Sequence, residues 1–404
     1  MHPTLKRRNG VRRSGPLSVG LAVALTATLT AACGSSKTTA ASTATTAASS
    51  ATTADSSATS PAGTVSSSVA AAEAVVAKYS KSPTTIGVTT PLNTVPPKGK
   101  TIVYVECEVT QCTDVGAGIQ AAATAVGWHT QFIRWQSTQP ATLVAGLQQA
   151  LQVTPKPAAV VVTGLAPAVW DSVVPAYQKA GIPLIPAFVG PSTINSTLIA
   201  NIFGPNDIAL VGKILADWFI ADSNGKGKVL LQDFPDIPSV SLGAQAFRKE
   251  VAAKCPACSI NSLDVTLAQL ATGATTPAIV SALQRYSQDT YFVSSDIGLV
   301  AGLPAALAAA GLSKVKVAGA AATVAEEQSL LNGTGSAFVA SALHYSGWLI
   351  VDVALRHVEG MTFSPEDGGL PEKLLTKATV GTPGVNQDLP VNYQQQFKAL
   401  WKVG

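Results

Sequence analysis

A cluster of polar side chains follows the first strongly apolar segment of the chain. Glu106 and Glu108 stand on either side of Cys107, and Gln111 and Cys112 come shortly after them. In an extended segment, residues two apart point to the same side, so both carboxylates can face one site. Two carboxylates and an amide there would hold a small polar or cationic molecule. The alternative is that one carboxylate caps the following helix and the other is solvated.

The polar cluster lies between an expected strand and an expected helix. Thr101–Val105 is short and rich in β-branched residues, which favours a strand. Apolar residues then recur at helical spacing over Asp114–Gly127. Strand, loop and helix make the first half of a βαβ unit, and ligands of open α/β sheets bind beyond the carboxyl ends of strands. The cluster is therefore placed where a ligand would bind.

Strands and helices alternate from Lys100 in two groups, which the polar linker 223–227 separates. The first group is predicted to have the strands Thr101–Val105, Thr130–Trp135, Ala158–Thr163, Pro183–Phe188 and Leu198–Phe203. Its helices are predicted at Asp114–Gly127, Pro140–Val153, Pro167–Ala180 and Asp207–Asp222. The second group has predicted strands at Lys228–Gln232, Ser259–Val265, Thr290–Ser294, Val315–Gly319 and Ala337–Leu343. Its helices are predicted at Ser239–Ala253, Pro277–Ser287, Leu299–Ala310, Val324–Leu331 and Tyr345–Val358, with a last short helix near Tyr393–Trp401.

Two such groups predict an α/β fold with two Rossmann-like lobes. Right-handed crossovers make each sheet parallel, with helices on both faces. The helix Tyr345–Val358 follows the second set of strands, and its return to the first lobe would make the chain cross between lobes more than once. Repeated crossings make a hinge with a cleft between the lobes.

The first 33 residues have the features of an export signal. Basic residues precede an apolar run, Leu17–Ala32, that is short for a membrane span, and Cys33 ends it. Small residues before this cysteine resemble the bacterial lipobox, in which the cysteine is acylated and becomes the new N-terminus. We therefore expect a lipoprotein signal peptide over residues 1–33 with a lipidated Cys33. Ordinary secretion with an incidental cysteine is the alternative.

The segment after the signal peptide separates it from the folded part. Residues 34–68 are rich in Ser, Thr and Ala and cannot bury enough apolar surface to order, so we expect a disordered tether. Residues 69–98 are expected to form a leading helix, packed on the outside of the first lobe, and a connector. We assign residues 99–223 with 344–372 to an N-terminal lobe and 224–343 with 373–404 to a C-terminal lobe.

The charge of the chain depends strongly on its first residues. The formal net charge is +4, with 27 basic and 23 acidic residues, and five of the basic residues lie in the signal segment. Without that segment the chain has 22 basic and 23 acidic residues, which leaves no footprint for nucleic acid.

Four cysteines lie in the predicted lobes. An even number in an exported protein favours disulfides, and three pairings are possible in principle. Bonds between lobes would lock the hinge, so the local pairs Cys107–Cys112 and Cys255–Cys258 are favoured. The lobe split also disfavours a four-cysteine zinc site. The Cys255-Pro-Ala-Cys258 spacing is that of a redox motif, but it follows a helix rather than opening one.

From Lys98 to the C-terminus the chain resembles the type I periplasmic binding proteins, the substrate-binding components of ABC importers. Stretches that carry the resemblance are KGKTIVYVECEVTQC, LIANIFGPNDIALVGKILADWF, GKVLLQDFPDIPSVSLGAQAFRKEV and YFVSSDIGLVAGLPAAL. The ribose-binding, sugar-type branch is nearest, and the cysteine pairs and tethered start resemble actinobacterial members.

The resemblance implies that polar groups at strand ends and aromatic rings hold a ligand in the cleft. The matching positions of the first lobe are Glu106, Glu108, Gln111, Thr163, Phe188 and Asn206. Those of the second lobe are Asp233, Phe234, Ser241, Asp296, Thr323 and His344. Some have structural alternatives, because Asp296 can cap a helix while Phe234 and His344 can belong to the hinge.

Two departures from the family pattern bear on the ligand. Ser241 stands where sugar binders commonly have an arginine, and Ala320-Ala321-Ala322 stands where an acidic residue is expected. We interpret the pocket as less suited to a highly hydroxylated sugar. The carboxylates of Glu106 and Glu108 would instead favour a cationic or amine-bearing ligand.

The expected function is that of an extracytoplasmic solute-binding protein, anchored to the cell membrane by its N-terminal lipid. It would capture a small molecule, with a sugar as the expected type, and deliver it to an ABC permease in the same membrane. We expect a monomer without cofactor, metal or nucleic-acid partner, and not an enzyme, because no G-x-S-x-G, P-loop or strand-following G-x-G-x-x-G is found. The alternatives are a sensor of the same fold acting on a membrane receptor, and a binder of an amine or other non-sugar solute.

Overall fold

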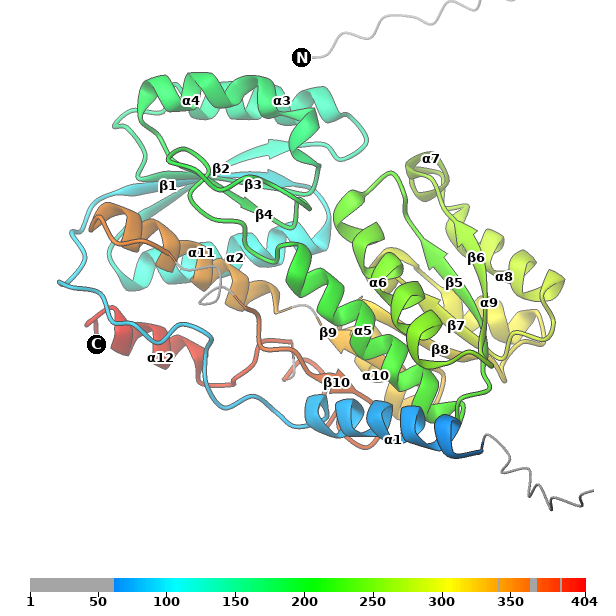
Figure 1. Cartoon of the computed structure of the whole chain (residues 1–404). Coiled ribbons are helices and arrows are strands. Elements are labelled where there is room, and N and C mark those ends of the chain that lie inside the picture. The colour runs from blue at the N-terminus through cyan, green and yellow to red at the C-terminus, as the bar shows by residue number, and fades with distance from the viewer. Residues whose placement is uncertain (1–61, 341, 364–368, 386) are drawn as a thin grey trace, which may run out of the picture. The chain divides into compact units, whose positions relative to one another are not determined.

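Two α/β lobes, each with its own sheet, organise the chain (Figure 1). The structure is a computed structural model that describes residues 62–340, 342–363, 369–385 and 387–404. The predicted signal peptide with Cys33, and residues 34–61 of the predicted tether, lie outside the described residues. Both lobes belong to one compact unit, Thr59–Gly404.

The sheet of the first lobe is parallel throughout, with the strand order β2-β1-β3-β4. Its strands are β1 (Thr101–Cys107), β2 (His129–Trp135), β3 (Ala159–Thr163) and β4 (Leu184–Ala187). Alternate residues of β1 enter different core layers, because successive side chains of a strand point to opposite faces. Ile102 and Tyr104 pack in one layer, while Val103 and Val105 pack in the other.

Helices cover both faces of this sheet. One layer contains α2 (Thr110–Ala125), α11 (Leu343–Val358) and α12 (Tyr393–Leu400), and the other contains α3 (Pro140–Ala150) and α4 (Val174–Ala180). The predicted helix Pro167–Ala180 is divided into two 3-10 turns, Pro167–Val169 and Asp171–Val173, followed by α4. Pro175 explains the division, because proline lacks the N–H that a helix interior needs and is accepted in the first turn.

The second lobe has a six-stranded sheet with the order β10-β9-β8-β7-β5-β6. Its strands are β5 (Lys228–Asp233), β6 (Ser259–Asp264), β7 (Tyr291–Ser294), β8 (Lys316–Ala322), β9 (Ala337–Ala340) and β10 (Leu374–Leu375). All neighbours are parallel except β10, which pairs antiparallel with β9. One face is covered by α1 (Ala62–Tyr79), α5 (Pro205–Asp222) and α6 (Pro238–Lys254). The remaining helices are α7 (Leu267–Ala271), α8 (Thr275–Arg285), the 3-10 turn η3 (Ile297–Leu299), α9 (Leu303–Ala309) and α10 (Val324–Asn332).

Three helices pack in a lobe other than the expected one. Helix α5, expected in the N-terminal lobe, packs against α6 and the core of the second lobe. Helix α1, expected on the first lobe, also lies on α5, and it starts at Ala62, inside the predicted tether. Helix α12, expected in the C-terminal lobe, packs in the first core. The ring of Trp401, which follows this helix, stacks on the ring of Trp348 with the ring centroids 5.1 Å apart. Each helix docks where its apolar face finds a complementary surface, which the order of elements does not specify.

The fifth strand predicted for the first lobe is a crossing segment instead. Leu198–Phe203 forms only two isolated bridges to β4, Leu184 with Leu198 and Ala187 with Ile202. Gly204 and Pro205 follow and start α5, so the chain has already passed to the second lobe before this helix begins.

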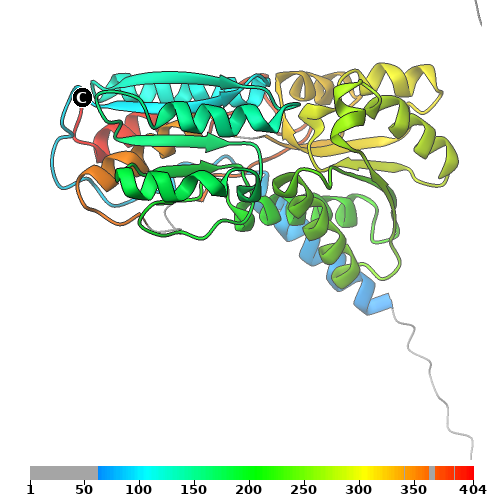
Figure 2. The ribbon, with the colours of Figure 1, turned by 90° about the horizontal axis from the view of Figure 1, so that it is seen from above.

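The chain crosses between the lobes repeatedly, as predicted for a hinge. The crossings are the connections from α1 to β1, β4 to α5, β9 to α11, α11 to β10 and β10 to α12 (Figure 1). Figure 2 shows the two groups of elements side by side, the cyan sheet with the orange and red helices in one and the yellow elements in the other. These connections hold the carboxyl ends of the strands of both sheets around one shared cavity.

Glycines bring helix backbones into direct contact within the lobes. A Cβ built on Gly347 of α11 would clash with the backbone nitrogen of Ile119 in α2, and one on Gly118 with the backbone oxygen of His344. The same arrangement joins α5 and α6, where a Cβ on Gly212 would clash with the backbone oxygen of Gly243. These helices therefore approach more closely than any other residue would allow.

Gly347→Ala tests this contact. We expect the free energy of unfolding to fall by about 1–3 kcal/mol, because overpacking against backbone atoms cannot be relieved by a side-chain rotation. Urea denaturation followed by circular dichroism measures the change. Gly369→Ala is the control, since a Cβ there would enter open space. An equal loss in both variants, or none in Gly347→Ala, would contradict the proposed role of the contact.

Candidate functional site

A cavity of about 210 Å³ lies where the carboxyl ends of both sheets meet. The first lobe contributes the ends of β1, β2 and β3, and the second contributes the segments after β5 and β7 and the end of β8. Four residues predicted from the sequence line this cavity: Gln111, Thr163, Phe188 and Asp296. The chain topology thus brings together positions up to 185 residues apart in the sequence.

Gln111 and Asp296 lie on opposite lobes close to Gly298. A Cβ built on Gly298 would lie 2.9 Å from Gln111 Nε2 and 3.3 Å from Asp296 Oδ1. The lobes also approach each other at Gly190, where a Cβ would lie 3.5 Å from the backbone nitrogen of Ser239. Loops of the two lobes therefore face each other around the cavity.

Asp296 is an ionisable residue of the cavity wall, two residues after the end of β7. Burial raises the pKa of its carboxyl to about 7, while the backbone N–H groups of Gly298 and Leu299 oppose the shift and the charge of Glu326 adds to it. Its Oδ1 is buried and has no hydrogen-bond partner among the described residues. A residue of the cavity wall therefore has an acceptor oxygen without a partner among the described residues.

Thr163 belongs to a small buried network under the cavity. Its hydroxyl is 2.9 Å from the hydroxyl of Tyr104, and the Tyr104 hydroxyl donates to the carbonyl oxygen of Cys112 at 3.2 Å. Burial raises the pKa of Tyr104 well above its ordinary value, so the phenol stays neutral. The network ties the end of β3 to the first turn of α2.

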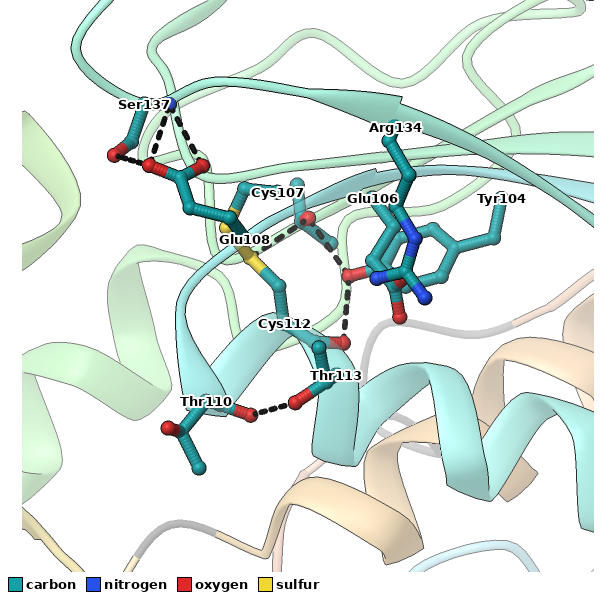
Figure 3. Close-up of a disulfide and its surroundings, with 10 residues drawn as sticks. Tyr104, Glu106, Cys107, Glu108, Thr110, Cys112, Thr113, Arg134 and Ser137 are labelled. Atoms are coloured by element: carbon teal, nitrogen blue, oxygen red, sulfur yellow. Dashed lines mark hydrogen bonds and ion pairs between the residues drawn. A yellow bond between two sulfur atoms is a disulfide. The ribbon is translucent and has the colours of Figure 1, made fainter. Parts of the chain in front are cut away.

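Glu106 and Glu108, the first candidates from the sequence, do not line the cavity. Glu106 is buried and forms an ion pair with Arg134 of β2 (Figure 3). Burial raises the pKa of Glu106, and the nearby Arg134 charge opposes that shift. The two carboxylates are therefore not a joint site for a cationic ligand.

Glu108 instead holds the loop after β2. It accepts hydrogen bonds from the backbone N–H of Ser137 at 2.9 Å and from its hydroxyl at 2.7 Å (Figure 3). Partial burial raises the pKa of Glu108, but these hydrogen bonds outweigh it and the net shift is downward. The carboxylate thus supports the wall of the cavity from outside.

The second-lobe candidates after β5 serve the lobe interior. Asp233 accepts from Ser241 Oγ at 3.2 Å and pairs with Arg248 at 3.0 Å. Phe234 is buried in the second core. Ser241, which occupies the position of the arginine expected in sugar binders, therefore helps to hold Asp233 and does not line the cavity.

The remaining candidates also lie off the cavity wall. Asn206 is exposed near the start of α5, and Thr323 caps α10 by accepting from the backbone N–H of Ala325. His344 lies 2.8 Å from Asp388 at a crossing between lobes. This hydrogen bond raises the pKa of His344, and partial burial opposes the shift. The structure therefore places His344 at the hinge, which was the structural alternative for this residue.

Several cavity residues were not expected from the sequence. Trp135 is the last residue of β2, and Ser295 directly precedes Asp296. The Nε1 of Trp135 and the Oγ of Ser295 are buried and have no hydrogen-bond partner among the described residues. Both follow the rule that strand ends carry the site, which predicts them if it is applied to every strand.

Two local disulfides are present in the structure, Cys107 with Cys112 and Cys255 with Cys258. The first closes the loop between β1 and α2, and both of its cysteines line the cavity (Figure 3). It therefore sets the shape of the segment that carries Gln111. The second follows α6 and precedes β6, away from the cavity.

Comparison with known proteins identifies the family. The periplasmic binding protein domain matches residues 108–362, which is more than half of the chain. This chain belongs to the periplasmic binding protein family. The resemblance inferred from the sequence is therefore confirmed, and the protein is a solute-binding protein rather than an enzyme. No curated protein sequence matches it.

Solved structures with the same fold include binding proteins of ABC transporters. An ABC transporter solute-binding protein from Agrobacterium vitis with bound allitol has a TM-score of 0.60 at 22% identity, covering 70% of this chain and 97% of its own. A 5-methylthioribose transporter solute-binding protein from Thermotoga lettingae in complex with 5-methylthioribose has a TM-score of 0.61 at 15% identity, covering 78% and 99%. The arabinose transporter component from Shewanella sp. ANA-3, bound to L-arabinofuranose, has a TM-score of 0.60 at 16% identity, covering 74% and 98%. At these identities the likeness establishes the shared two-lobe fold.

Within the described residues, every helix is too short or too polar to span a membrane. No group of His, Cys, Asp and Glu among them is arranged to hold a metal ion.

Variants of Gln111 and of the two glutamates test which side chains contact the solute and which only support the cavity wall. Gln111→Ala is expected to weaken solute binding by roughly 2- to 10-fold, the value of one hydrogen bond. The double variant Glu106→Gln with Glu108→Gln is expected to leave affinity within about twofold, because neither side chain lines the cavity. Titration calorimetry with the tightest-binding solute of the thermal-shift panel described below gives both values. Weaker binding by the double variant than by Gln111→Ala would show that the two carboxylates contribute to solute binding.

Proposed function

We propose that this periplasmic binding protein captures a small solute between its lobes and delivers it to an ABC permease in the same membrane. The observation that carries the proposal is the cavity itself, whose wall is shared by strand ends of both lobes. A ligand in such a cavity contacts both lobes, so it favours the arrangement in which they are together. That arrangement is what a permease can recognise.

A sugar-type solute is the starting point for the ligand. The neighbours with the same fold hold allitol, 5-methylthioribose and arabinofuranose. The amine alternative loses its main support, because Glu106 is paired with Arg134 and Glu108 with Ser137.

A thermal-shift screen of the full chain tests solute binding. The panel contains sugars, polyols, amino acids, amines and aromatic acids. A true ligand at 100 times its Kd stabilises the folded protein by about 2.7 kcal/mol. The thermal unfolding midpoint of the protein with this ligand should therefore lie clearly above that of the free protein. Conversion of a bound solute to product, or no stabilisation by any member of the panel, would contradict the proposal.

Cys33→Ala tests the anchor that would keep the protein near its permease. We expect the wild-type chain in the membrane fraction and the variant in the soluble or secreted fraction, because only a cysteine can be acylated there. Fractionation of the producing cells followed by immunoblotting measures this. Cys255→Ser is a matched control, since it removes a cysteine of the folded part only. Membrane association of the Cys33 variant would reject the lipid anchor.

A further inference from the structure

The cavity has a much larger apolar than polar wall. Rings and branched chains face it from both lobes, among them Trp135, Leu165 and Phe188 of the first lobe and Val240 and Leu299 of the second. Among the described residues that line it there is no Lys, Arg, His or Glu. A sugar with a hydroxyl on every carbon needs hydrogen-bond partners around its whole perimeter, and this wall does not supply them.

Several hydroxyl groups of the wall already serve the protein. Ser294 donates to Gln232 at 2.6 Å, Ser137 donates to Glu108 at 2.7 Å, and Thr163 is paired with Tyr104 at 2.9 Å. Each hydroxyl has one proton to donate, so these groups offer a ligand little donor capacity.

The groups without a partner within the described residues stand on the two lobes. Trp135 Nε1, a donor, belongs to the first lobe, and the Trp135 side chain is only 2% exposed. Ser295 Oγ and Asp296 Oδ1 belong to the second. Buried polar atoms without partners are rare in folded proteins and need an explanation, and for residues of a cavity wall a bound ligand supplies one. Together with the side-chain amide of Gln111, which also lines the cavity, they define a few hydrogen-bond positions in a largely apolar wall.

We propose that the solute is a neutral molecule with a substantial apolar portion and few hydroxyl groups, held by Trp135 of one lobe and by Ser295 and Asp296 of the other. An acceptor oxygen of the solute takes the indole N–H, and a hydroxyl donates to Asp296. The apolar portion lies against Leu165, Val240 and Leu299. This inference rests on the proposed solute-binding function and gives its ligand a chemical class.

Two probe groups test the proposal by titration calorimetry with the full chain. Ribose, arabinose and allitol form the fully hydroxylated group. 5-Methylthioribose and 2-phenylethanol form the group with an apolar portion, and 2-phenylethylamine is the charged counterpart of the latter. We expect the tightest binding within the apolar group, by at least about 10-fold over any fully hydroxylated probe, since one apolar group in such a pocket is worth roughly 10- to 200-fold.

The outcomes separate this inference from the function on which it rests. Tightest binding by ribose, arabinose or allitol would overturn the inference and leave the solute-binding function standing. Tighter binding of 2-phenylethylamine than of 2-phenylethanol would overturn the neutral class in favour of a cation. If none of the probes and no member of the wider screen binds, both the function and the inference fail.

Variants locate the contacts with the tightest probe. Trp135→Phe keeps an aromatic ring but removes the N–H, so affinity should fall by roughly 2- to 10-fold. Trp401→Phe is the control, because this indole is buried in the first core and does not line the cavity. The affinity of this variant for the probe should match that of the wild type. Equal affinity losses in the two variants would show a general effect of core disruption and overturn the role of Trp135.

Asp296→Asn distinguishes a hydroxyl from a cation at the second lobe. Asparagine retains an acceptor oxygen, so a neutral solute should lose no more than about 10-fold in affinity, the difference between a charged and a neutral hydrogen bond. A loss above about 100-fold would show that the carboxylate pairs with a positive charge and overturn the proposal.

Val240→Thr keeps the shape of the wall and adds a hydroxyl. The ratio of affinities between the apolar and the fully hydroxylated probes should therefore become smaller. An unchanged preference would remove Val240 from the contact surface.

Discussion

The structure depends on the repeated passage of the chain between two parallel sheets. A parallel sheet gathers the loops after its strands at one edge, and the crossings keep these edges of both lobes facing the same gap. The contact between α2 and α11 anchors this arrangement, because the backbones meet at Gly118 and Gly347 without intervening side chains. Helix α2 carries Gln111 in its first turn, and α11 starts at a crossing. The position of a cavity residue is thus tied to the hinge by backbone packing.

Charge is used in the lobes mainly to hold elements together. Glu106 pairs with Arg134 between neighbouring strands, Asp233 pairs with Arg248 across β5 and α6, and Asp352 pairs with the buried Arg356 in α11. A carboxylate removed from water needs such a partner, because an unpaired buried charge costs far more than the pair contributes. These ion pairs leave the cavity wall nearly neutral. Asp296 is the exception, and the hydrogen bonds it accepts from backbone N–H groups only partly offset the effect of burial on its pKa.

The apolar wall is consistent with the two departures from the sugar-binding pattern. The serine in place of an arginine belongs to the interior of the second lobe, and the alanines at the end of β8 contribute Ala320 and Ala321 to the wall. Both changes remove groups that would hydrogen-bond a ring of hydroxyls. Selectivity in such a cavity comes from the cost of leaving solute hydroxyls without partners, more than from attractive contacts.

Local pattern alone determined the two-lobe α/β fold and strands β1–β9, but it missed β10 and wrongly predicted a strand at Leu198–Phe203. β-branched runs and helical spacing are local properties, and the strand-end rule placed Gln111 where a ligand would bind. Thr163, Phe188 and Asp296 were added by the resemblance to the family. Tertiary structure decided the rest, because docking depends on surfaces distant in the chain. It assigned α1, α5 and α12 to lobes other than those expected, and it paired Glu106 with Arg134. It also brought Trp135 to the cavity with its N–H unpartnered, since whether a strand-end side chain meets a protein group or an open space is settled only when the opposing lobe is in place.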